Sequence, residues 1–254
     1  MRRKYVVLFC ISILTIPTSA QHINTARLDS LFDILSAKNR VMGSFAIAQN
    51  GQLVYKRAVG YSLANSSKRV EATDHTLYNT GSVSKMFTAT MIFQLIDEGK
   101  LSLQTKLFKY YPQIPNADSI TIEQLLNHSS GLFDVANDPE EDWKLIPHTK
   151  TELLDAIIKG KPHFKPGIKT EYNNTGYILM AWLIEKLTGQ TFNQNLQSRI
   201  CKKAGLKSTY SPLSNRHKKN EAVPYFYADD WEPIADVYAE NSTGASNIYS
   251  TPEE

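Results

Sequence analysis

The chain has 254 residues, which is enough to bury a substantial core in one large domain or two modest ones. A hydrophobic content of 42% and 13 tyrosines are typical of a globular protein and argue against a disordered one. The formal net charge of +3 comes from Arg2, Arg3 and Lys4, because without them 25 basic residues face 25 acidic ones. Nothing in this balance indicates a nucleic-acid partner.

The first twenty residues differ from the rest of the chain. A basic triplet at 2–4 precedes an apolar run over 5–16, and the small residues of 17–20 offer a cleavage site. This is the pattern of a secretory signal peptide, and the run is too short to span a bilayer comfortably. We therefore predict residues 1–20 as a signal peptide and residues 21–254 as the mature domain. The protein is then exported, periplasmic or secreted from a bacterium, without a stable membrane span.

Signal cleavage would remove Cys10 and leave Cys201 as the single cysteine. Cys10 follows Phe9, where a lipoprotein signal needs a small residue, so we do not expect lipidation. A lone thiol cannot form an intramolecular disulfide, and the mature fold must rest on its hydrophobic core.

The mature chain opens with a helix and a hairpin. Apolar residues recur at helical spacing from Thr25 to about Lys38, which predicts an amphipathic helix. Strand-like runs over 44–49 and 52–59 follow. They are joined by Asn50-Gly51, a pair that tolerates the positive φ angles of a two-residue turn.

Residues 83–98 are apolar nearly all round and stop at Gly99, which predicts a buried central helix. Further helical signals follow it: capping boxes from Thr121 and Thr149, an apolar run over 177–187 ended by Gly189, and a run from about Thr191 to Lys203. We therefore predict an all-helical subdomain over about 100–205.

Beyond Gly205 the chain is polar and rich in aromatic residues and proline, and its pattern places no strand. Residues 251–254 carry the N-cap threonine, the proline and the glutamate of a helix start, yet no helix follows. We expect from this that the sequence stops short of the protein's own end.

Ser82-Val83-Ser84-Lys85 is the only Ser-x-x-Lys string in the sequence, and it opens the predicted central helix. Residues i and i+3 share a helix face, so the hydroxyl and the amine can come within hydrogen-bonding reach. A partly desolvated lysine has a lowered pKa and can accept the serine proton, and the helix N-terminus can stabilise an oxyanion. An N-cap serine beside a solvated lysine would give the same string.

Tyr172-Asn173-Asn174 is the only Tyr-x-Asn string, and it directly precedes an apolar helix. A tyrosine near an ammonium has a lowered phenol pKa and can relay protons. Asn174 could orient a substrate carbonyl through its amide. A buried tyrosine and an N-cap asparagine are the simple alternative.

The two strings, about ninety residues apart across a helical subdomain, resemble the penicillin-recognising serine hydrolases. That family embraces class C β-lactamases, D-alanyl-D-alanine carboxypeptidases, D-aminopeptidases and related esterases. Residues 125–132 and 173–177 are also similar to stretches of class C-like members. The resemblance covers most of 24–254.

The resemblance implies an α+β fold, an α/β sandwich with an antiparallel sheet and an inserted all-helical domain. It implies an acylation–deacylation cycle without metal or cofactor, on a small molecule or a peptidoglycan-type peptide: a D-amino-acid peptide, a β-lactam or an ester. Carried over, Ser82 is the nucleophile, Lys85 activates it, Tyr172 relays protons and Asn174 helps to hold the acyl group. Whether Lys85 or an ionised Tyr172 takes the first proton stays open.

One element of the family is missing. Its third motif, Lys-Thr-Gly or His-x-Gly on the strand beside the nucleophile, has no convincing counterpart, and we discount the nearest string, 242–244. We expect that the C-terminal strands, roughly a hundred residues, lie outside the sequence. A penicillin-binding sensor and a catalytically inert fragment therefore remain alternatives to an active hydrolase.

Two further sequence features contain side chains that could take part in catalysis. Residues 123–127 resemble the deacylating Glu loop of class A β-lactamases, but their place in the chain favours a capped helix. His128 could be a general base, although a buried and satisfied histidine is the favoured interpretation. The six histidines show no metal-ligand spacing, so we predict no metal site.

Overall fold

The computed structural model describes residues 23–65, 67–138, 141, 143, 145–213, 220–235 and 237–254. The predicted signal peptide over 1–20 lies outside the described residues. Among the helices that are described, none combines the length and the hydropathy needed to cross a bilayer.

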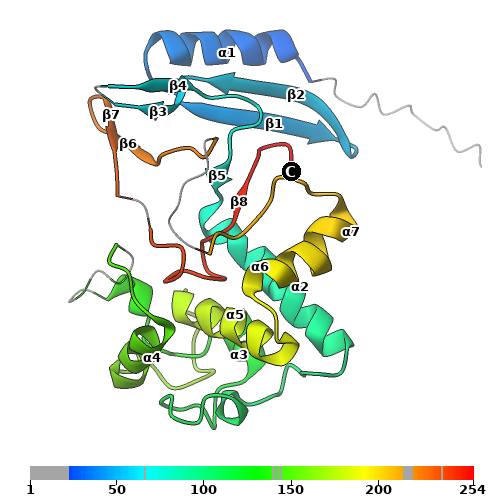
Figure 1. Cartoon of the computed structure of the whole chain (residues 1–254), viewed down its shortest axis with the longest axis vertical. Coiled ribbons are helices and arrows are strands. Elements are labelled where there is room, and N and C mark those ends of the chain that lie inside the picture. Colours follow the sequence, from blue (N-terminus) through cyan, green and yellow to red (C-terminus); the bar gives the residue numbers. More distant parts are fainter. Residues whose placement is uncertain are drawn as a thin grey trace, which may run out of the picture.

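The N-terminal layer is the predicted helix and hairpin. Helix α1 spans Thr25–Ala37, and strands β1 (Gly43–Gln49) and β2 (Gln52–Val59) pair antiparallel. Asn50 and Gly51 join them with φ angles of 53° and 74°, as the turn requires. Helix α1 lies along one face of the hairpin (Figure 1).

Three further two-stranded antiparallel ladders were not predicted from the sequence. They pair β3 (Tyr61–Ala64) with β4 (Arg69–Glu71), β5 (Tyr78–Asn79) with β8 (Tyr249–Ser250), and β6 (Tyr225–Tyr227) with β7 (Trp231–Pro233). The β5–β8 ladder lies between the N-terminal layer and the helices (Figure 1). It brings the end of the chain beside the segment that enters the central helix.

Helix α2 spans Ser84–Asp97 and follows a 3-10 turn, η1, at Gly81–Val83. The helix forms as predicted, but the predicted burial holds for one face only. One face is buried, as at Met91, but Met86 and Phe93 are 62% and 48% exposed. Its apolar residues are spread round the axis, whereas the described chain packs against one side only.

The region between residues 100 and 205 contains helices and no named strand in its described part. The helices are α3 (Ile122–Leu126), α4 (Lys150–Lys159), α5 (Asn174–Thr188), α6 (Phe192–Leu196), α7 (Lys202–Ala204), the 3-10 turns η2 (Leu107–Lys109) and η3 (Val135–Asn137), and the π turn η4 (Gln197–Cys201). The capping boxes predicted from Thr121 and Thr149 are both formed. Each supplies side-chain partners for backbone N–H groups that the helix itself leaves open.

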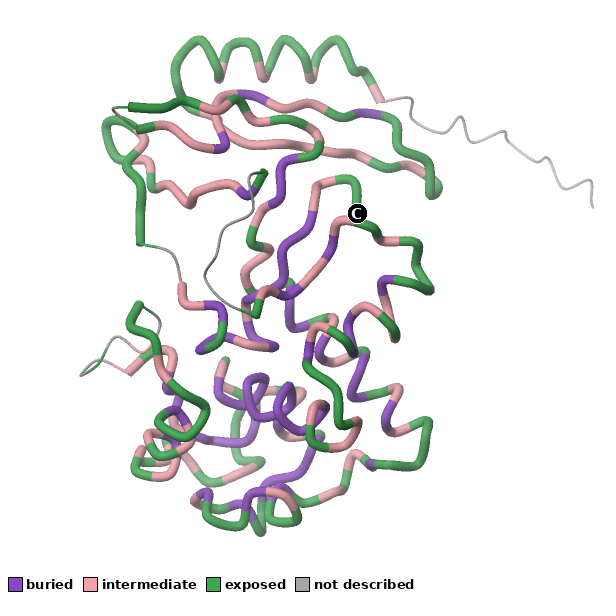
Figure 2. The backbone as a smooth tube through the Cα atoms, viewed as in Figure 1, coloured by how far each residue is buried: buried purple, intermediate pink, exposed green. Residues whose placement is uncertain are grey.

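The hydrophobic core centres on α5. Every residue from Thr175 to Ile184 is buried, and α5 packs against both α2 and α3. In Figure 2 the buried residues gather along α5 and the side of α2 that faces it. The helix ends as predicted, at Gly189 in the left-handed conformation. Cys201 is buried and free.

Candidate active site

Ser82 lies in the turn that joins β5 to α2. Gly81 has a φ of 54°, and its N–H is accepted by the side chain of Asn79 at 2.8 Å. The neighbouring Val83 N–H is accepted by the carbonyl of Thr80 at 3.2 Å. This tight turn presents the Ser82 side chain at an exposed position just ahead of the helix.

Lys85 is the second residue of α2 and is 6% exposed. Its Nζ lies 3.2 Å from Ser82 Oγ and 2.9 Å from each of two carbonyl oxygens, Asn174 Oδ1 and the backbone oxygen of Ala245. A carbonyl oxygen can only accept, so these two contacts take two N–H bonds of the amine. The remaining tetrahedral direction faces Ser82, where it carries a proton in the ammonium or a lone pair in the neutral amine.

Tyr172 also contacts Ser82. Its hydroxyl lies 2.5 Å from Ser82 Oγ, and Lys85 Nζ lies 4.7 Å from the centre of its ring. The side chain is 50% exposed, which contradicts the alternative of a buried structural tyrosine.

The helix cap belongs to Asn173, whose side chain accepts the N–H of Gly176 at 2.9 Å. Asn174 is therefore not the N-cap, and its amide is available to Lys85. The structure brings together all four side chains that the two strings predicted: Ser82, Lys85, Tyr172 and Asn174.

The ring of His128 packs against the ring of Tyr172. Its ring lies 4.7 Å from that of Tyr172 and 5.2 Å from that of Tyr177, and its Nδ1 accepts the N–H of Asn173 at 3.2 Å. Burial, reinforced by the positive charge of Lys85, lowers the pKa of His128 below its usual value. The imidazole is therefore neutral at pH 7, and its acceptor nitrogen is occupied.

The Ala245 carbonyl is a site group that the sequence did not suggest. It follows Gly244, which has a φ of 81° and whose added Cβ would lie 2.5 Å from the Cβ of Ala181. Thr88 also donates to the carbonyl of Gly244 at 2.7 Å. The string 242–244 thus lies in a turn against α2 and α5 and not on a strand. The family's third motif lies on a strand, so this position agrees with the decision to discount the string.

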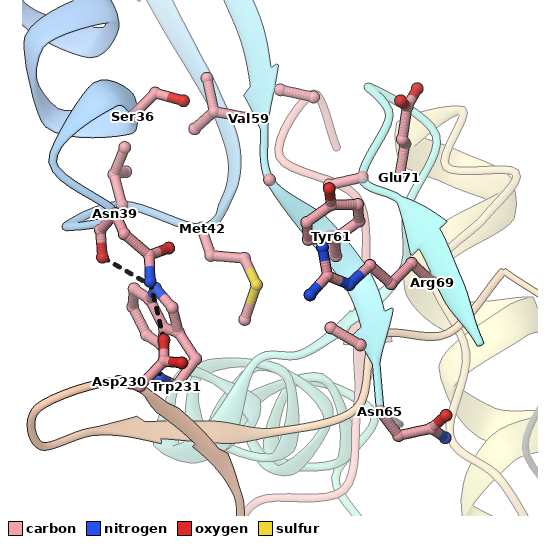
Figure 3. A pocket seen from close by; sticks show the side chains of 15 residues that line it. Ser36, Asn39, Met42, Val59, Tyr61, Asn65, Arg69, Glu71, Asp230 and Trp231 are labelled. Carbon is pink, nitrogen blue, oxygen red and sulfur yellow. Dashed lines mark hydrogen bonds between the residues drawn. The ribbon is translucent and has the colours of Figure 1, made fainter. Parts of the chain in front are cut away.

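A separate cavity of about 710 Å³ opens between the end of α1, strands β2 to β4 and β7 (Figure 3). Its lining includes Tyr61, Arg69 and Trp231, and none of the four site residues contributes to it. Asn39 donates to Asp230 at 2.7 Å at its edge. No cluster of His, Cys, Asp or Glu suited to a metal ion occurs among the described residues.

Comparison with known proteins identifies the family. The family model described as Beta-lactamase matches residues 28–254. The chain belongs to the beta-lactamase family. A penicillin-binding protein of Bacillus subtilis is 29% identical over 204 residues, covering 78% of this chain and 44% of its own length. The teichoic acid D-alanine hydrolase of Staphylococcus aureus is 29% identical over 217 residues, covering 84% of this chain and 52% of its own length.

A solved structure supports the fold. The D-amino acid amidase of Ochrobactrum anthropi superposes with a TM-score of 0.73 at 24% identity, over 88% of this chain and 67% of that chain. The predicted α+β class with a β-lactamase-like arrangement is therefore confirmed. This beta-lactamase-family chain spans about half the length of the curated relatives that it matches.

Proposed function

We propose that the protein is a serine hydrolase that forms an acyl-enzyme on Ser82. The observation that carries this proposal is the arrangement at Lys85, where two carbonyl oxygens at 2.9 Å leave one direction of the amine pointing at Ser82 Oγ. An N-cap serine beside a solvated lysine would not bury the lysine in this way. Membership of the beta-lactamase family supports the same chemistry.

In the first step Ser82 Oγ attacks the substrate carbonyl and loses its proton. Lys85 in its neutral form and Tyr172 in its ionised form are both placed to accept it, at 3.2 Å and 2.5 Å from the oxygen. The bond from the carbonyl carbon to the leaving group then breaks, and the leaving group takes the proton. Water attacks the resulting ester by the same route, which restores the Ser82 hydroxyl.

Asn174 has a second amide hydrogen for the substrate. One hydrogen of its Nδ2 is donated to Asp134 at 3.0 Å, and the described residues offer the other no acceptor. The carbonyl oxygen of a bound acyl group can fill that place. This is consistent with the role expected for Asn174 in holding the acyl chain.

The substrate that we propose is an acyl donor of the D-alanine type: an ester, a D-amino-acid peptide or a β-lactam. The names of the two relatives point to this range, because one is a teichoic acid D-alanine hydrolase and the other a penicillin-binding protein. Both are 29% identical to this chain, which favours a shared reaction over a shared substrate.

We propose further that residues 1–20 are removed on export, and that residues 21–254 form a hydrolase domain with its helical subdomain over about 100–205. N-terminal sequencing of the protein recovered outside the cytoplasm tests the first part. A mature chain that begins at Gln21 is expected, whereas recovery with Met1 intact contradicts export by cleavage.

The reaction is tested with a fluorescent penicillin and a D-alanyl ester on the full-length protein and on Ser82→Ala. We expect an adduct that peptide mass spectrometry places on Ser82, and ester turnover that Ser82→Ala lowers at least about a thousandfold. Ser84→Ala is the matched control, since Ser84 is buried and its Oγ accepts the N–H of Ile248 at 3.0 Å. Ester turnover that survives in Ser82→Ala would contradict a mechanism through an acyl-enzyme on Ser82.

The fate of the adduct separates the substrate classes. Rapid release of the penicillin indicates a β-lactamase, and a long-lived adduct indicates a carboxypeptidase or a penicillin-binding sensor. Ester turnover without penicillin labelling indicates an esterase.

A further inference from the structure

Asp134 is a buried carboxylate next to the site that the sequence did not single out. It is 5% exposed and lies directly before the turn η3. Its Oδ1 accepts the backbone N–H of Asn174 at 3.2 Å, and its Oδ2 accepts the side-chain amides of Asn174 at 3.0 Å and Asn137 at 2.7 Å. Within the described part of the chain, no Lys, Arg or His nitrogen lies within ion-pair distance of it.

The amide of Asn174 thus lies between an amine and a carboxylate. Its oxygen accepts from Lys85 Nζ at 2.9 Å, and its nitrogen donates to the carboxylate of Asp134 at 3.0 Å. The two ends of an asparagine amide are nearly equal in shape, so the surrounding hydrogen bonds decide which end faces which way. A carboxylate can accept but not donate, and this fixes the NH₂ group on its side.

We propose that Asp134 is a positioning residue that holds the Asn174 amide with its oxygen toward Lys85. This inference rests on the proposed acylation of Ser82. The oxygen of Asn174 is one of the two carbonyl groups that direct the third bond of Lys85 at Ser82. Asp134 therefore acts on the nucleophile through Asn174 and Lys85, without touching the substrate.

The segment around Asp134 is tied to the start of α5 on both sides. Asn173 Nδ2 donates to the carbonyl of Leu132 at 2.8 Å, and the N–H of Val135 is accepted by Thr175 Oγ1 at 3.0 Å. The two flanking contacts hold the carboxylate against residue 174. Asp134 is therefore a buried hydrogen-bond acceptor for Asn174 and Asn137 and not a solvent-exposed acid.

Replacement of Asp134 by Asn changes an acceptor into a donor at the same place. Asn174 and Asn137 both point NH groups at Oδ2, so an amide nitrogen there leaves donors facing donors. The Asn174 amide relieves this conflict when it turns over, and its NH₂ then faces the N–H groups of Lys85. Lys85 then loses one of its two carbonyl hydrogen-bond partners, and its third bond direction is no longer held toward Ser82.

The test measures the rate at which a fluorescent penicillin or a D-alanyl ester acylates Ser82 in the full-length protein. We expect Asp134→Asn to slow acylation about 10- to 100-fold, which lies within the range of coupling between residues in one hydrogen-bond network. Asn137→Ala is the matched control, because it removes one bond to the carboxylate and leaves both bonds to Asn174. It is expected to change the rate by less than about threefold.

A double-mutant cycle separates positioning from general loss of structure. In an Asn174→Ala background, Asp134→Asn is expected to change the acylation rate by less than about threefold, because the amide on which it acts is gone. If Asp134→Asn slows acylation equally with and without the Asn174 amide, the positioning role is overturned. An unchanged rate in the single variant overturns it as well.

A second variant covers the case in which Asp134→Asn does not fold. Asn174→Asp keeps an oxygen for Lys85 but places a carboxylate against Asp134, so we expect it to acylate more slowly than Asn174→Ala. Faster acylation than in Asn174→Ala contradicts the contact. A wild-type protein that never labels at Ser82 instead overturns the proposed function, and the inference about Asp134 falls with it.

Discussion

The two helices that bring the site together begin in opposite ways. At the start of α2, neither Thr80, the N-cap residue of the 3-10 turn, nor Val83, the N-cap residue of the helix, makes a side-chain cap hydrogen bond. At the start of α5, Asn173 caps the helix, and its own backbone N–H and amide are both taken up by the segment 128–132.

This difference corresponds to two different tasks that we propose for the two helix starts. The uncapped start of α2 presents Ser82, and a helix N-terminus without a side-chain cap keeps its positive potential for an oxyanion. The capped start of α5 instead holds Tyr172 against Ser82 and Asn174 against Lys85. Changes at α5 should therefore lower stability and the proposed activity together, whereas changes at the α2 turn should act on the position of Ser82.

The largest effect is expected at Tyr172. Tyr172→Phe removes the hydroxyl that lies 2.5 Å from Ser82 Oγ, and loss of a proton relay typically costs about 10²- to 10⁴-fold in rate. The measurement is ester turnover with saturating substrate. Tyr177→Phe is the control, because its hydroxyl donates to the carbonyl of Leu126 at 3.0 Å and not to Ser82. Equal losses in both variants would contradict a specific role for Tyr172.

The next effect concerns the α5 cap. Asn173→Ala removes the acceptor for the Gly176 N–H and the donor to the Leu132 carbonyl, both buried. We expect the free energy of unfolding to fall by about 1–3 kcal/mol, as measured by urea denaturation. Asn173→Asp keeps the acceptor for the Gly176 N–H but places a second acceptor against the Leu132 carbonyl, so it should also lose stability. A variant as stable as wild type would show that the cap does not hold this end.

A smaller effect is expected at the α2 turn. Gly81→Ala meets no atom within 4 Å, so its cost comes only from the φ angle of 54°. That conformation costs an L-residue about 1–2 kcal/mol, which the same denaturation measures. Acylation of Ser82 should slow in proportion to any relaxation of the turn. An unchanged unfolding energy would mean that the turn adjusts without strain.

The smallest effect is a pH dependence at His128. Burial and the charge of Lys85 lower its pKa from the ordinary 6.5, so the folded protein favours the neutral imidazole. The stability that this provides is full above pH 6.5 and is lost as the pH falls through the lower folded pKa. An NMR titration of the ring protons checks it, and a midpoint at or above 6.5 contradicts it. His128→Asn, which tolerates the positive φ of 61°, should remove this part of the pH dependence.

The sequence predicted which four side chains would meet, because their chemistry sits in short strings. Ser82 with Lys85 and Tyr172 with Asn174 have fixed local spacing, and each string stands at the start of a helix that the apolar pattern makes visible. The main helices and the first hairpin were predictable for the same reason. Their signals are local and repeat over several turns or residues.

The parts that the sequence did not predict depend on contacts between distant residues. Ala245 contributes a backbone carbonyl, which every residue type carries, so no side chain marks it. Asp134 is marked only by its hydrogen bond with Asn174, which is distant in the sequence, and it belongs to no periodic pattern. The ladders of two to four residues are too short for alternation to be read. The exposure of Met86 and Phe93 depends on which elements pack against α2, and the apolar pattern alone does not say this.

The contact between Lys85 and Ala245 joins residues 160 positions apart and has a consequence for biosynthesis. During translation α2 leaves the ribosome long before Ala245 does, and non-local contacts form only after the intervening chain has been ordered. Until then Lys85 lacks the Ala245 carbonyl, one of its two carbonyl hydrogen-bond partners, and the orientation of its amine toward Ser82 is not fixed. The hydrogen bonds of Lys85 are therefore completed only after the helical region has folded and the segment at Ala245 has docked.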